Sequence, residues 1–121
     1  MAAKDELGRR GERIAEHHLT ERGLVVLDRN WRCPSGEIDL VLRDGDETVF
    51  VEVKTRAGLG YGHPLEAITM VKLARLRRLA GEWCEHRRAA GQPVGRIRID
   101  AVGVIAPVDA PARIDHLEGV F

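Results

Sequence analysis

The sequence has few of the features that mark secreted or membrane proteins. Its 121 residues include two cysteines, Cys33 and Cys84, and neither lies in a CxxC or Cys/His arrangement that would indicate a zinc site. No stretch approaches the roughly 18 to 20 apolar residues that a membrane-spanning helix requires. The first segment, MAAKDELGRRGERIAEHHL, is charged throughout and lacks the apolar core of a signal peptide. These absences predict a cytoplasmic protein with reduced cysteines and no membrane partner.

The chain also lacks a net charge, which by itself argues against a nucleic-acid partner. The charges are nevertheless unevenly distributed, because segment 37–52 holds six acidic residues and one arginine, whereas segment 72–98 holds eight basic residues and two glutamates. An acidic centre beside a basic segment suits a metal site next to a phosphate-binding surface. A solvated, arginine-rich helix face explains the basic segment equally well.

A chain of this length can form one domain with a core, over residues 1–121, but not two. Apolar periodicity predicts helices over residues 4–22 and 64–90, and the second helix has a stripe of core positions that includes Leu65, Ile68 and Val71. Strands are expected over residues 24–28, 37–43, 47–55, 96–105 and 113–121. This order predicts an α/β fold with a mixed central sheet flanked by helices.

The stretch 36–56, GEIDLVLRDGDETVFVEVKTR, predicts a β-hairpin with its turn signal at Asp44-Gly45. Alternation along the first strand places Ile38, Leu40 and Leu42 on one face. The opposite faces of the two strands carry charged residues among apolar neighbours, where an unpaired buried carboxylate would cost several kcal/mol. The charged residues at these positions are Glu37, Asp39, Glu52 and Lys54. We interpret their missing partner as a divalent metal ion.

The register of the hairpin decides whether the carboxylates share a face. A two-residue loop at Asp44-Gly45 would place Glu37 opposite Glu52, and a four-residue loop over residues 44–47 would place Asp39 opposite Glu52. A three-residue loop without a bulge would separate the carboxylates and exclude the metal site.

The spacing Asp-x12-Glu-x-Lys supports a specific chemistry. Asp39 and Glu52 would supply two carboxylates, and the carbonyl of Val53 would supply a third oxygen ligand, which suffices for a hard ion such as Mg²⁺ that retains several waters. Such an ion could polarise a phosphodiester oxygen and lower the pKa of a bound water, while Lys54 orients that water or stabilises charge on phosphorus. An ion-paired cluster in which Lys54 only neutralises the carboxylates is the alternative interpretation.

The segments GEIDL (36–40) and FVEVKTR (50–56) resemble the YraN-type family of small bacterial proteins. That family is similar to the archaeal Holliday junction resolvases and to the wider PD-(D/E)xK, restriction-endonuclease-like superfamily. The resemblance extends from Gly8 through Lys72 to the strand that contains Asp100. It implies an αβββαβ core, Mg²⁺ or Mn²⁺ as cofactor, hydrolysis of phosphodiester bonds in DNA, including branched or processed DNA, and, by analogy with the resolvases, a homodimer.

The resemblance also implies roles for individual residues. Asp39 and Glu52 would be metal ligands, Lys54 the catalytic lysine, and Glu12 the acid from the first helix that completes the site. Glu37 matches the GEID segment and would either bind a second ion or orient the site.

The nucleic-acid contacts are expected from basic residues around this site. The candidates are Lys72, Arg75 and Arg78 of the long helix and Arg56 after the hairpin. In the loop 57–64, Tyr61 and His63 are candidate substrate contacts, although a simple connector explains the loop as well.

The sequence departs from the superfamily pattern because Ile38 stands where a proline precedes the aspartate. A catalytically inactive module that binds nucleic acid or a protein partner on the same fold is therefore the alternative function.

Overall fold

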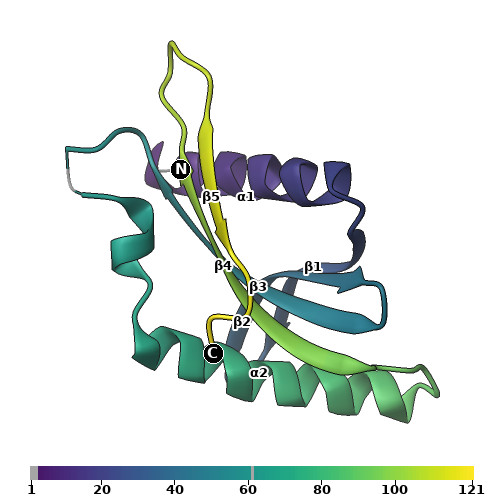
Figure 1. Ribbon diagram of the computed structural model, residues 1–121. Helices are drawn as coiled ribbons and strands as arrows, with labels where there is room; N and C mark the ends of the chain where they lie inside the picture. Colours follow the sequence, from purple (N-terminus) through teal and green to yellow (C-terminus); the bar gives the residue numbers. More distant parts are fainter. Residues whose placement is uncertain (1–2, 61) are drawn as a thin grey trace.

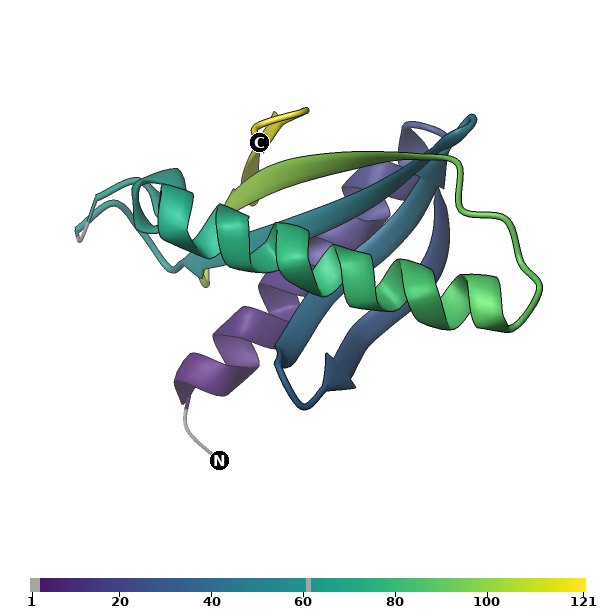
Figure 2. The same ribbon diagram turned by 90° about the horizontal axis from the view of Figure 1, so that it is seen from below.

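The computed structural model describes residues 3–60 and 62–121, so Tyr61 lies outside the described residues. Five strands form one sheet in the order β1-β2-β3-β4-β5, with α1 on one face and α2 on the other (Figures 1 and 2). Strands β3 and β4 are parallel and the other neighbours are antiparallel, which confirms the mixed sheet and the αβββαβ order. The elements are α1 (Ala3–Glu21), β1 (Val25–Cys33), β2 (Gly36–Asp44), β3 (Glu47–Arg56), the 3₁₀ helix η1 (Pro64–Ala67), α2 (Met70–Ala89), β4 (Arg96–Ile105) and β5 (Arg113–Leu117).

Each face of the sheet buries its own apolar core. Beneath α1, Ala15 and Leu19 pack with Leu40 and Val51. Beneath α2, Trp83 contacts Phe50 edge to face, with ring centroids 5.4 Å apart. A sheet buried on both faces needs apolar residues at successive positions, as 49–51 and 101–105 show, and polar side chains within it therefore stand out. Within the described ranges, no helix is long and apolar enough to cross a membrane.

The close approach of α1 to β3 depends on a glycine. A Cβ atom at Gly11 would lie 1.7 Å from Oγ1 of Thr55, a distance that no packing tolerates. The glycine therefore lets the helix backbone lie directly against Thr55, near the C-terminal end of β3. The next residue on the helix, Glu12, is close to Asn30 of β1.

The predicted helix over residues 64–90 is wrong in its first two turns. Residues Pro64–Ala67 form the 3₁₀ helix η1, and Ile68 and Thr69 then adopt extended backbone angles. The side chain of Thr69 accepts a hydrogen bond from the Lys72 amide and begins α2 as a new helix. Because the helix is interrupted, Val71 is not in the core stripe but 78% exposed.

The predicted alternation along β2 is also wrong at one residue. Leu40 and Leu42 pack beneath α1 as expected, but Ile38 packs beneath α2 with Val41 and Phe50. The neighbouring strand β1 is irregular here, with a register shift between Val26 and Asp28 and a left-handed Asn30 (φ 47°). The regular face alternation is thus lost at Asp39, between Ile38 and Leu40.

Candidate active site

Asp39 lies where β2 and β3 diverge. Their ladder runs from Asp44↔Glu47 at the Gly45-Asp46 turn to Leu40↔Val51, so the next step places Asp39 opposite Glu52. Of the two registers that the sequence allowed, this is the one with Asp39 opposite Glu52. Asp44 and Glu47 also pair, so the loop is two residues long and not four. Beyond the ladder, the Val53 amide donates to Oδ2 of Asp39 at 2.9 Å. The carboxylate is therefore held between the two strands.

Asp39 and Glu52 line one small cavity of about 270 Å³, which we call the acidic cavity. Glu37 completes its acidic side, and Lys72 and Arg75 reach it from α2. Leu76 and Leu79 also line it, so the carboxylates lie against apolar side chains. The structure thus brings the three acids of the hairpin together in one cavity.

The electrostatics of this cavity are those of crowded carboxylates. Burial raises the pKa of Asp39 to about 8, and the negative charges of Glu52, Glu12 and Glu37 contribute to the rise, while the hydrogen bond from the Val53 amide opposes the shift. A carboxyl group in this state is mostly protonated at neutral pH unless a cation compensates its charge.

Glu52 is surrounded differently from Asp39. Burial raises the pKa of its carboxyl group above the ordinary value, and the positive charges of Lys72, Lys54 and Arg75 reduce this rise without cancelling it. Three cations from β3 and α2 therefore act on the charge of Glu52. From the sequence we expected either Lys54 or a metal ion to neutralise it.

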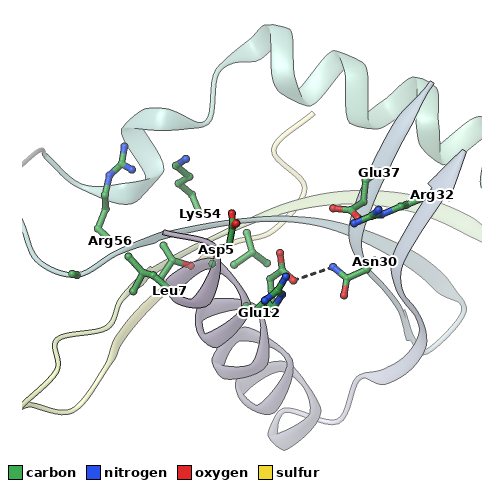
Figure 3. Close-up of a pocket in the computed structure, with 13 residues that line it drawn as sticks. Asp5, Leu7, Glu12, Asn30, Arg32, Glu37, Lys54 and Arg56 are labelled. Carbon is green, nitrogen blue, oxygen red and sulfur yellow. Dashed lines mark hydrogen bonds and ion pairs between the residues drawn. The ribbon is translucent and has the colours of Figure 1, made fainter. Parts of the chain in front are cut away.

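Glu12 and Glu37 are near the cavity, but other side chains hold their carboxylates. Oε1 of Glu12 accepts a hydrogen bond from Nδ2 of Asn30 at 3.0 Å, and Oε2 of Glu37 accepts one from Nε of Arg32 at 2.6 Å (Figure 3). Across the described parts of the chain, no three His, Cys, Asp or Glu side chains converge closely enough to hold a metal ion. Glu12 and Glu37 act on Asp39 as neighbouring charges.

A larger cavity of about 800 Å³ adjoins the acidic cavity at Glu37, and we call it the β3 cavity. It lies between the first half of α1 and the ends of β1 and β3 (Figure 3). Lys54 and Arg56 of β3 line it together with Glu12 and Asn30. Lys54 thus connects the two cavities, because it lines the β3 cavity and also acts electrostatically on Glu52.

The candidate nucleic-acid contacts occupy three different places. Lys72 lines the acidic cavity, and its ammonium donates to the carbonyl of Ala67 at 3.0 Å. Arg75 lines the same cavity and donates to the carbonyl of Ser35 at 3.3 Å. Arg56 lines the β3 cavity, and Arg78 is exposed on α2 outside both cavities.

The loop residue His63 has a structural partner. Its Nδ1 accepts a hydrogen bond from the Leu65 amide at the start of η1, and its Nε2 lies 2.7 Å from Oδ2 of Asp115. These contacts support the simple connector, because they join the loop to η1 and β5 and not to the carboxylates.

Sequence reasoning missed Asn30. A left-handed backbone in a strand is tolerated best by glycine, asparagine and aspartate, so an asparagine at this position was the available signal. Its side chain is the group that holds Glu12.

It also missed that the three acids next to the hairpin turn are already paired. Arg98 of β4 lies 2.8 Å from Asp44 and 3.1 Å from Glu47, and Arg96 lies 3.3 Å from Asp46. The acids that remain in the centre are those of the two cavities.

The donor set of the acidic cavity suits a hard divalent cation. The two carboxylates are oxygen donors, and a cation between Asp39 and Glu52 would oppose the burial and the repulsion that raise the pKa of Asp39. Mg²⁺ and Mn²⁺ fit such a set, whereas zinc prefers nitrogen and sulfur ligands.

Comparison with known proteins agrees with the resemblance seen in the sequence. Residues 11–104 match the Uncharacterised protein family UPF0102. A UPF0102 protein of Leifsonia xyli subsp. xyli is 58% identical over 120 residues, with 99% of each chain covered, and one of Beutenbergia cavernae is 54% identical over the same coverage. A UPF0102 protein of a Nocardioides species is 53% identical over 119 residues, which are 98% of this chain and 94% of the relative. The chain therefore belongs to the UPF0102 (YraN) family.

Proposed function

We propose that this protein is a metal-dependent nuclease that hydrolyses phosphodiester bonds in DNA. The observation that carries the proposal is the placement of Asp39 between diverging strands, opposite Glu52 and inside one cavity with it. A protein that needed these carboxylates only for folding would place them with full partners, yet Asp39 has a strongly raised pKa.

Bound Mg²⁺ or Mn²⁺ would supply Lewis-acid polarisation of a phosphodiester oxygen. Asp39 and Glu52 hold the charge that attracts the ion, and the Val53 amide keeps the Asp39 carboxylate oriented. Lys54 follows Glu52 by two residues on the same strand, so the two side chains lie on the same face of the sheet. The Lys54 ammonium could there stabilise negative charge on the phosphoryl group. Glu12 and Glu37 add negative potential without needing to bind the ion directly.

The substrate backbone would approach from the α2 side. Lys72 and Arg75 already reach the acidic cavity, and Arg78 continues the row of cations along the exposed helix surface. Phosphate contacts of this kind bind without regard to sequence. DNA, including branched or processed DNA, is therefore the proposed partner, with a homodimer as the proposed assembly.

A second candidate is a non-catalytic nucleic-acid-binding module. One observation favours it: Lys72, Lys54 and Arg75 compensate the charge of Glu52 without any metal ion. In that case the carboxylates would serve to position cations that bind phosphate.

Cleavage assays with matched variants separate the two candidates. We expect the purified protein to cut at least one of linear, flapped and four-way DNA with Mg²⁺ or Mn²⁺, and to lose cleavage with chelator and in Asp39→Asn, Glu52→Gln and Lys54→Ala. Asp46→Asn is the control, because this exposed turn residue lies outside both cavities. A folded protein that cuts none of these substrates, yet binds DNA equally well as wild type and as Asp39→Asn, would refute the nuclease and support the module.

A further inference from the structure

The β3 cavity has a cationic side, of which the proposed hydrolysis uses only Lys54. Besides Lys54, the cavity is lined by Arg56 of β3, Arg9 of α1 and Arg32 of β1. Lys54 and Arg56 rise from β3 next to each other and on the same side (Figure 3). Three acids also line the cavity. Arg32 is paired with Glu37 and Asn30 holds Glu12, whereas Asp5 of α1 is exposed.

The side chain of Arg56 is not fully satisfied within the protein. Its Nε is buried and has no hydrogen-bond partner among the residues that the structure describes. A buried donor without an acceptor is costly, and it is usually explained by a group that is missing from the structure. Arg56 lines the cavity, so an anion with oxygen acceptors bound there would meet its guanidinium group.

The size of the cavity restricts the anion. A volume of about 800 Å³ corresponds to a cube of about 9 Å on each edge, which is narrower than the major groove of B-DNA alone, about 12 Å. We therefore expect the cavity to take one or two nucleotides of an unpaired strand and not a duplex.

The spacing and the chemistry of the lining indicate phosphates and not bases. Residues two apart on a strand are separated by about 7 Å, which is close to the separation of neighbouring phosphates in an extended single strand. None of the described residues that line the cavity is aromatic, so they offer no platform for base stacking.

We propose that the β3 cavity binds consecutive phosphates of a single-stranded DNA segment through Arg56, Lys54 and Arg9. The substrate of the nuclease is then DNA that carries a single-stranded extension or flap. The cavity meets the acidic cavity at Glu37, so a strand held by Arg56 leads directly to Asp39 and Glu52. This inference rests on the proposed function for its substrate, but the binding itself can be measured without cleavage.

The test is the binding of fluorescent DNA in the presence of chelator. The probes are a blunt duplex and the same duplex with a short single-stranded extension of thymidines or of adenines, measured by anisotropy over a range of salt concentrations. We expect the extension to tighten binding about tenfold, equally for both bases, because phosphate contacts dominate. Arg56→Gln and Arg9→Gln should each remove several-fold of that gain and reduce the salt slope by about 0.7.

Arg43→Gln is the matched control, because Arg43 is an exposed arginine of the same hairpin outside both cavities. It should bind both probes as wild type does. Arg9 is exposed on α1, so its replacement tests the cavity even if Arg56→Gln folds poorly.

Equal binding of blunt and extended DNA, or equal loss of both in Arg56→Gln, would overturn the inference. Cleavage of blunt duplex without preference for the extension would also overturn it while leaving the nuclease intact. Preferential binding without any cleavage would uphold the cavity and refute the nuclease.

Discussion

Replacing Asp39 with asparagine should stabilise the protein at alkaline pH. The pKa of Asp39 is raised from its ordinary value near 4 to about 8. Between these two values the folded protein holds a proton that the unfolded chain has released. The free energy of unfolding of the wild type must therefore fall as pH rises through this window. The asparagine side chain of the variant has no charge to gain, and its amide oxygen can still accept the Val53 hydrogen bond.

The magnitude follows from the shift. From pH 5 to pH 8 the window covers three pH units, each equivalent to about 1.4 kcal/mol, which gives an upper bound of about 4 kcal/mol. Asp39 is only half-buried and lines an open cavity, so water and counterions reduce the penalty. We expect the stability of Asp39→Asn relative to wild type to increase by about 2 to 3 kcal/mol over this range.

Urea denaturation followed by tryptophan fluorescence, with chelator present, measures this difference at each pH. Trp31 and Trp83 both pack in the core beneath α2 and report on its loss. Adding about 10 mM Mg²⁺ at pH 8 should restore about 1.4 kcal/mol to the wild type if its Kd is about 1 mM, and nothing to Asp39→Asn. If the free energies of unfolding of the two proteins changed with pH in the same way, the raised pKa of Asp39 would be refuted.

Three other predictions concern parts of the protein outside the acidic cavity. Gly11→Ala should cost about 1 to 3 kcal/mol of stability, because its Cβ would overlap Thr55, whereas Gly8→Ala on the same helix meets no atom within 4 Å and should be neutral or stabilising in thermal unfolding. Asp100→Asn should cost about 3 to 5 kcal/mol, because it breaks the fully buried contacts to Arg98 and His116. Burial would raise the pKa of Asp100, but the hydrogen bonds from His116 and Arg98 outweigh it and lower the pKa. Its contribution is therefore present at neutral pH and is lost below about pH 4, so Asp100→Asn and wild type should converge in acid denaturation. The homodimer stays a prediction, and sedimentation equilibrium at micromolar concentration should give twice the 13.5 kDa of one chain, while a single-chain mass would exclude it.

The sequence predicted the sheet and its element order because these depend on apolar alternation, but it left two hairpin registers open, of which the structure has the one that places Asp39 opposite Glu52. It could not predict the break before α2, since Thr69 is an N-cap signal within a segment whose apolar spacing continues a helix. It also could not predict which acids are paired, because Asp44 and Glu47 meet Arg98 only after β4 pairs with β3. The face of Ile38 was missed because the left-handed Asn30 is a property of the neighbouring strand.

The hydrogen bond between the Val53 amide and the Asp39 carboxyl has one more consequence. The acceptor of this amide is a titrating side chain and not a carbonyl, so its environment changes when the side chain gains or loses a proton. The backbone nitrogen of Val53 is therefore a built-in spectroscopic probe of the acidic cavity. In nuclear magnetic resonance spectra its amide signal should move with an inflection near pH 8, at a position next to Glu52 where no substitution needs to be made.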